Sequence, residues 1–104
     1  MSTFVVMQTY RVKSEHRDAY LALIPELVKS GMDLGCVFFD VYEDDDVKNL
    51  FIEMMGFDSW THYSRLRQVP PTRAMEAIHR DLDLWVEGGL DAILVNHLQT
   101  RAVG

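Results

Sequence analysis

The pattern of apolar and polar residues predicts two neighbouring strands in the middle of the chain. Segments 36–42 and 50–55 are short and rich in aromatic and β-branched residues, and the polar stretch 43–49 separates them. This pattern is typical of two antiparallel strands joined by a turn. A weakly alternating segment at 4–12 and a largely apolar one at 91–99 predict the first and last strands.

Helical spacing of apolar residues predicts a long helix over 14–32, between the first two strands. Ser14 is expected to be its N-cap. Pro25 falls inside this segment, so we expect a kink or break there, or two shorter helices. Gly31 and Gly35 are expected to end the helix.

The second half of the chain predicts two further helices before the last strand. Asp58 or Ser59 is expected to cap a short helix that ends at Gln68, because two prolines follow. Thr72 is expected to begin a longer amphipathic helix, which the glycine pair starting at Gly88 ends.

The order strand, helix, strand, strand, helix, strand predicts an α+β, ferredoxin-like βαββαβ fold over the single domain 1–104. In this fold a four-stranded antiparallel sheet carries helices on one face. The first strand is apolar on both sides, with Phe4 and Val6 on one and Val5 and Met7 on the other. We therefore predict that a second copy covers the face without helices, giving a homodimer in the form of a dimeric α+β barrel.

Charge and composition exclude several partners. The chain of 104 residues has a formal charge of -6, which opposes binding to nucleic acid. It has neither a signal-peptide pattern nor an apolar run long enough to span a membrane, so we expect no membrane partner. Its single cysteine, Cys36, lies in an apolar segment and indicates a buried thiol in a reducing compartment, the cytoplasm.

Two clusters of charged residues are interpreted as ordinary surface features. Asp44, Asp45 and Asp46 lie in the central turn but lack the alternating ligands, central glycine and final glutamate of a calcium loop, so we predict no metal site. A group of arginines could form an anion site, but solvated helix faces explain it better. Its members are Arg65, Arg67, Arg73 and Arg80.

Three segments resemble a known family. They are the opening strand 4–12 followed by Lys13 and a helix, the Gly35-Cys36 entry to the second strand, and segment 50–60 leading into a helix. Together they resemble the dimeric α+β barrel superfamily and, within it, the antibiotic biosynthesis monooxygenase type of domain. The resemblance spans nearly the whole chain and implies oxidation of a phenolic or quinol-type aromatic compound with no cofactor, neither metal nor flavin.

The chain departs from the family pattern near the third strand. Relatives often place Trp two residues after the strand glutamate, where Met55 stands here, and His62 comes earlier than their helical histidine. The Asn, Trp and His set of haem-degrading relatives has no counterpart, so haem chemistry is not implied.

Glu53 and His79 are the candidate catalytic residues. Glu53 shares one side of its strand with Phe51 and Met55, and burial there would raise its pKa and make it a usable base. The alternative is a structural ion pair with a residue such as Arg11. His79 lies at the edge of an apolar helix face, where it either points into a pocket or stays partly wet.

A small aromatic ligand would need a cavity with aromatic walls and a few polar groups. The candidate substrate-binding residues are Gln8, Tyr10, Trp60, Tyr63, Trp85 and Asn96. The aromatic members are alternatively core residues. Asn96 and His97 point to opposite sides of the last strand, and the sequence does not decide which of them faces the helices.

Three functions remain open at this point. The first is a cofactor-independent monooxygenase, the second a non-oxidative isomerase or cyclase on the same barrel, and the third a non-catalytic ligand-binding or structural dimer. A cavity of roughly 300 Å³ or more, reached by Glu53 or His79, would favour an enzyme.

Overall fold

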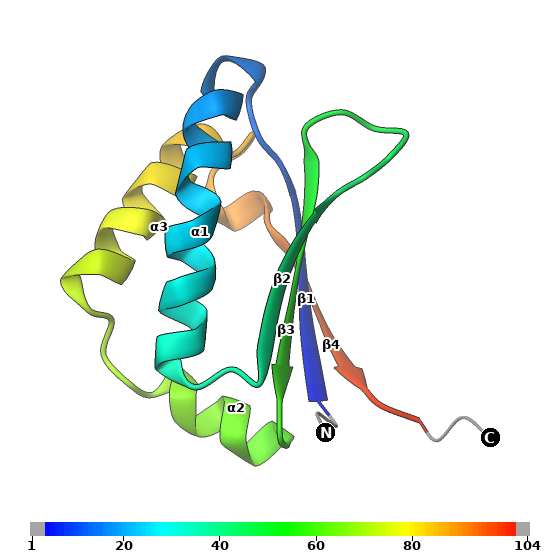
Figure 1. The fold of residues 1–104 in the computed structure, drawn as a ribbon, viewed down its shortest axis with the longest axis vertical. Helices are drawn as coiled ribbons and strands as arrows, with labels where there is room; N and C mark the ends of the chain where they lie inside the picture. The colour runs from blue at the N-terminus through cyan, green and yellow to red at the C-terminus, as the bar shows by residue number, and fades with distance from the viewer. Residues whose placement is uncertain (1–3, 102–104) are drawn as a thin grey trace.

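The computed structural model describes residues 4–101 and has two layers, a sheet and a layer of helices (Figure 1). Its strands are β1 (Phe4–Arg11), β2 (Phe38–Glu43), β3 (Leu50–Phe57) and β4 (Leu94–Gln99). They lie in the order β2-β3-β1-β4, and each neighbouring pair is antiparallel. The predicted ferredoxin-like fold is therefore confirmed.

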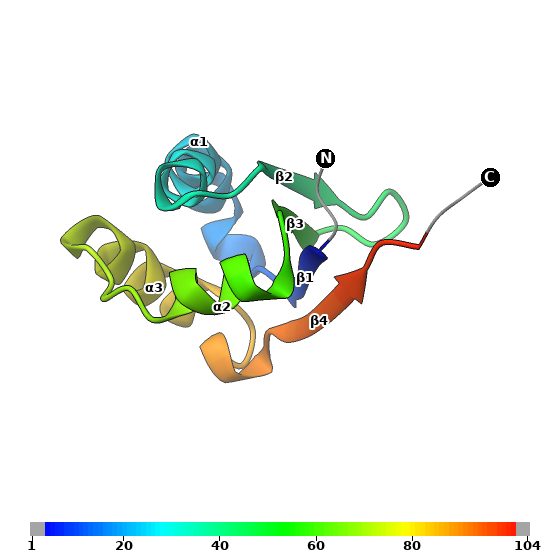
Figure 2. The same cartoon turned by 90° about the horizontal axis from the view of Figure 1, so that it is seen from below.

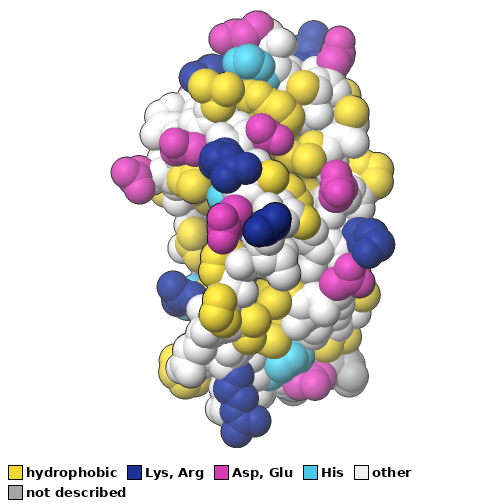
Figure 3. All heavy atoms as spheres, turned by 90° about the vertical axis from the view of Figure 1, so that its left-hand side faces the viewer, with side chains coloured by type: hydrophobic (Ala, Val, Ile, Leu, Met, Phe, Trp, Pro, Cys, Tyr) yellow, Lys and Arg dark blue, Asp and Glu magenta, His cyan; other side chains and the backbone are white. Residues whose placement is uncertain are grey.

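The helices α1 (Arg17–Leu34), α2 (Trp60–Arg67) and α3 (Arg73–Trp85) all lie on the same side of the sheet (Figure 2). Short 3₁₀ turns at Ser14–His16 and Leu90–Ala92 lead into α1 and β4. Acidic, basic and apolar side chains are interspersed on the outer surface of the helical layer (Figure 3). Among the described residues, no helix is long and apolar enough to cross a membrane.

The first helix differs from its prediction in three ways. Ser14 makes no side-chain cap because it lies in the 3₁₀ turn, and α1 begins at Arg17. The helix continues through Pro25 without ending, since buried residues on both sides of Pro25, Tyr20 and Leu27, anchor it to the core. Gly31 lies within α1, which ends only at Gly35 with φ of 122°.

Gly31 is needed for close packing between α1 and β2. A Cβ added at this position would lie 2.1 Å from a carbon of the Phe39 ring. The sequence suggested a helix end because glycine commonly ends helices, whereas here it lets a helix approach a strand.

The other caps and the central turn follow the prediction. The Ser59 side chain accepts a hydrogen bond from the His62 amide at 3.1 Å, and Thr72 accepts one from Met75 at 3.2 Å. Asp44 Oδ1 accepts hydrogen bonds from the amides of Asp46 and Val47, both at 2.9 Å. This carboxylate therefore stabilises the turn, as short polar side chains commonly do.

The register of the sheet decides which side chains face the helices. Gln8 pairs with Glu53 between β1 and β3, and Val6 pairs with His97 between β1 and β4. His97 thus faces the helices, where its ring lies 5.3 Å from that of Tyr63, and Asn96 faces the opposite side. The core lies between the sheet and α1 and α3, and includes Val6, Tyr20, Phe51, Ile78 and Leu82.

The other face of the sheet carries no helix among the residues that the structure describes. It is largely apolar, and we call it the open face. Its apolar side chains include Val5, Met7, Ile52, Met54, Leu94 and Leu98.

Candidate functional site

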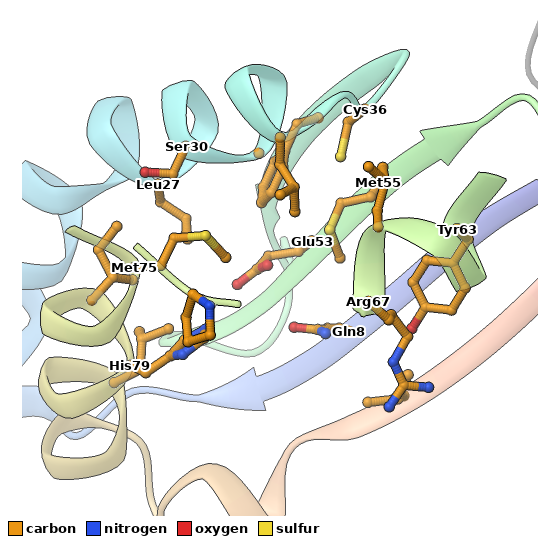
Figure 4. Close-up of a pocket in the computed structure, with 18 of the residues that line it drawn as sticks. Gln8, Leu27, Ser30, Cys36, Glu53, Met55, Tyr63, Arg67, Met75 and His79 are labelled. Atoms are coloured by element: carbon orange, nitrogen blue, oxygen red, sulfur yellow. The ribbon is translucent and has the colours of Figure 1, made fainter. Parts of the chain in front are cut away.

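A cavity of about 500 Å³ lies between the helix-facing side of the sheet and the three helices (Figure 4). Most of its wall is apolar, with Leu27, Phe39, Met55 and Ile78 among the lining residues. The polar side chains that line it are Gln8, Ser30, Glu53, Tyr63, Arg67 and His79. Its volume is in the range of small-molecule sites and exceeds the roughly 300 Å³ that would favour an enzyme.

Glu53 lies in the middle of β3 with only 3% of its surface exposed. Strand alternation turns it toward the helices together with its neighbours Phe51 and Met55. The Tyr10 hydroxyl donates a hydrogen bond to Glu53 Oε2, and the Tyr10 and Tyr20 hydroxyl oxygens lie 2.6 Å apart. The carboxyl group is therefore held by a buried tyrosine pair.

Burial has a large effect on the protonation of this group. It raises the pKa of Glu53 to about 7, and the hydrogen bond from Tyr10 limits the rise. Burial also raises the pKa of Tyr10 and of Tyr20, so both phenols keep their protons at neutral pH. Glu53 can accordingly accept or release a proton near neutrality, as a general acid or base must.

His79 and Arg67 bring positively charged or titratable groups to the cavity from α3 and α2. Both residues are exposed and line the cavity. The Arg67 guanidinium lies over the Tyr63 ring at 5.7 Å from its centre. Arg67, interpreted from sequence as a solvated residue, is both exposed and part of the cavity wall.

The structure brings together four of the predicted site residues, namely Gln8, Glu53, Tyr63 and His79. Tyr10 is buried behind Glu53 and does not line the cavity.

The remaining three candidates lie elsewhere. Trp60 is 58% exposed at the start of α2, Trp85 stacks on His16 with ring centres 6.0 Å apart, and Asn96 is on the open face. None of the three lines the cavity.

The alternative reading of Glu53 as the partner of Arg11 is wrong. Arg11 faces the other side of the sheet, and its Nε atom lies 3.9 Å from Oε2 of Glu87.

Sequence reasoning did not place Arg67 and Cys36 in the cavity wall. It also missed Tyr20, because at helical spacing this residue is indistinguishable from other apolar core positions. The contact between Tyr10 and Glu53 could have been predicted only by assuming a strand register. In the observed register Gln8 pairs with Glu53, and Tyr10 lies two residues further along β1 on the same side of the sheet.

Metal ligands are not clustered in the part of the chain that the structure describes. No group of three or more His, Cys, Asp or Glu side chains is placed to hold an ion among residues 4–101. Cys36 lines the cavity as a buried thiol, and burial raises its pKa to about 11. It is thus a poor thiolate nucleophile at neutral pH.

Solved structures show the same fold. The structure of an antibiotic biosynthesis monooxygenase matches with a TM-score of 0.75 and 15% identity, over 95% of this chain and 99% of that one. Protein Rv0793 of Mycobacterium tuberculosis matches with a TM-score of 0.74 and 16% identity, over 98% of each chain. A conserved protein of Methanosarcina mazei Go1 matches with a TM-score of 0.76 and 14% identity, over 97% of this chain and 95% of that one.

Sequence comparison identifies the family. No curated protein matches the chain significantly. The sequence model of the family described as antibiotic biosynthesis monooxygenase matches residues 3–77, which is most of the chain and includes β1 through the start of α3. The chain therefore belongs to the antibiotic biosynthesis monooxygenase family.

Proposed function

We propose that the protein is a cofactor-independent monooxygenase that oxidises a small phenolic or quinol-type aromatic compound. The observation that supports this most is a buried carboxyl group, Glu53, with a pKa near neutrality in the wall of an apolar cavity of about 500 Å³. An apolar cavity suits an aromatic ring, and the carboxylate suits the removal of a phenolic proton.

The proposed reaction needs no reductant other than its substrate. Glu53 accepts the hydroxyl proton, and the electron-rich phenolate then reacts with molecular oxygen at a ring carbon. One oxygen atom becomes the new carbonyl oxygen of a quinone. The other leaves as water with the hydroxyl hydrogen and the hydrogen of the attacked carbon, so the substrate supplies all the electrons.

The other polar groups of the cavity have supporting roles in this proposal. Gln8 lies directly across from Glu53 in the paired strands, where its amide can donate to the phenolate oxygen. Tyr63 forms an aromatic wall, and His79 can donate a hydrogen bond to the developing product at the cavity surface. Trp60, Trp85 and Asn96 have no role here because they do not line the cavity.

We also propose that the protein works as a homodimer in the cytoplasm. The open face of the sheet would leave a band of apolar side chains in water, among them Leu94 with 66% of its surface exposed. A second copy packed face to face would remove this area from water and close the barrel. The buried, free Cys36 thiol supports a reducing compartment.

Oxygen uptake with a panel of phenols and quinols tests the function. We expect uptake by the wild-type protein and a loss of at least about 100-fold in Glu53→Gln, since general base catalysis contributes on that order. His79→Ala should also lower turnover without unfolding the protein, whereas Lys29→Gln, on the exposed side of α1, serves as a control.

Two results would contradict the proposal. Turnover of a phenol that proceeds equally well without oxygen would indicate an isomerase or cyclase instead. Ligand binding with no turnover in any condition would indicate a binding protein, and a rise in melting temperature would reveal such binding because ligands stabilise the native state.

A further inference from the structure

Three buried side chains form a hydrogen-bonded chain that crosses from the helical layer into the sheet. Tyr20 on α1 is fully buried, Tyr10 on β1 is 3% exposed and Glu53 on β3 is 3% exposed. The Tyr20 and Tyr10 hydroxyls are 2.6 Å apart, and Tyr10 donates to Glu53. Only Glu53, at the end of this chain, lines the cavity.

The direction of these hydrogen bonds follows from the number of protons. A phenol carries a single hydroxyl hydrogen. When Glu53 is ionised, Tyr10 donates its hydrogen to the carboxylate, so Tyr20 must be the donor to the Tyr10 oxygen. When Glu53 is protonated, it can donate to Tyr10, and the whole chain can reverse. Both states thus keep the buried groups hydrogen-bonded, which makes either one tolerable in the core.

We propose that Tyr10 and Tyr20 are positioning residues for Glu53: they hold its Oε2 atom on the core side and leave Oε1 for the substrate hydroxyl. This inference rests on the proposed function and deepens it, because it assigns Tyr10 a role behind the base in place of a role in substrate contact. Tyr20 acts through Tyr10, since its hydroxyl lies within hydrogen-bond distance of the Tyr10 hydroxyl.

Other titratable or charged groups surround the same cavity and are unchanged in the variants that follow. They are Cys36 before β2, Tyr63 and Arg67 on α2, and His79 on α3.

The titration of Glu53 in the ligand-free protein tests the positioning directly. The infrared carbonyl band of the protonated carboxyl is followed against pH, and Glu53→Gln identifies the band. Tyr10→Phe removes a hydrogen bond to the Glu53 carboxylate, so it should raise the midpoint of the Glu53 titration by about one pH unit. Tyr20→Phe should raise it by less, because it weakens the Tyr10 bond without removing it.

Tyr42→Phe is the matched control. Tyr42 is 52% exposed on the opposite face of the sheet, so removal of its hydroxyl should leave the midpoint unchanged. If either phenylalanine variant in the core fails to fold, 3-fluorotyrosine in place of Tyr10 keeps the shape of the side chain. Its more acidic hydroxyl is a stronger donor and should lower the midpoint instead.

The pH profile of kcat/KM then links the positioning to the reaction. Its rising limb should move with the infrared midpoint in both core variants, while KM stays close to that of the wild type. Unchanged midpoints in the folded variants would overturn the proposal, and so would midpoints that move while the activity limb does not. Absence of oxygen uptake in the wild type would instead contradict the proposed function, and the infrared midpoints would still decide whether the tyrosines hold the carboxyl group.

Discussion

Glu53 shows how a position in the fold changes the chemistry of one residue. An exposed glutamate has a pKa near 4.5, and burial among apolar side chains raises that of Glu53 to about 7. The raised value also affects folding, because the native state binds a proton that the unfolded state has lost between these two pH values. The stabilisation by this proton is complete below pH 4.5 and is lost as the pH rises through about 7.

We predict that the wild-type protein loses more stability than Glu53→Gln between pH 4.5 and pH 8. The pKa difference corresponds to about 3 kcal/mol of unfolding free energy. Urea unfolding at several pH values measures this, and the other titrating groups cancel because both proteins contain them. Parallel stability profiles for the two proteins would mean that the Glu53 pKa is not raised in the fold.

At the scale of elements, contacts between segments decide where helices continue and how closely they pack. The start of α1 is tied to the central hairpin by Arg17, which makes hydrogen bonds of 2.5 and 2.8 Å to Glu43 and one of 2.7 Å to Asn49. The hydrogen bond from Arg17 lowers the pKa of Glu43 to about 2. The other end of the same helix is fixed against β2 by the contact between Gly31 and Phe39.

We predict that Gly31→Ala destabilises the protein although alanine favours helices. The added methyl group overlaps the Phe39 ring, and overpacking of this kind costs about 1–3 kcal/mol, more than the gain in helix propensity of about 1 kcal/mol. Thermal unfolding should show a lower melting temperature. Lys29→Ala, on an exposed turn of the same helix, should change the melting temperature little. An unchanged or higher melting temperature for Gly31→Ala would contradict the close contact between Gly31 and Phe39.

At the scale of the whole molecule, the two faces of the sheet have different tasks. The helix-facing side contributes Gln8 and Glu53 to the cavity, and the open face presents apolar side chains to a second copy in our proposal. Successive side chains of a strand point to opposite faces, so a side chain of the open face can be replaced without replacing one that lines the cavity.

We predict that Leu94→Glu converts the proposed dimer to a monomer. Leu94 is 66% exposed on the open face. A carboxylate at this position would be buried in the interface with the second copy without a positively charged partner. Leu84→Glu is the matched control, since Leu84 is 61% exposed but lies on α3. Sedimentation analysis should give a dimer for the wild type and the control. A monomeric wild type would contradict the proposed dimeric barrel.

The sequence by itself determined the strand and helix order, a cap at Thr72, a cap at either Asp58 or Ser59, and the apolar side of β3 on which Glu53 lies. These follow from local periodicity and hydrogen bonding, which a few neighbouring residues encode. Only the tertiary structure decided that Tyr20, Tyr10 and Glu53 form one hydrogen-bonded chain, because the three residues come from separate elements.

The strand register and the packing of the two layers decided where Asn96, His97 and Gly31 lie. The pairing of β1 with β4 turns His97 to the helices and Asn96 away from them, and no local pattern distinguishes these two neighbours. The approach of Phe39 explains why Gly31 lies inside a helix. Such contacts join residues distant in sequence, so their energies appear only when the layers pack together.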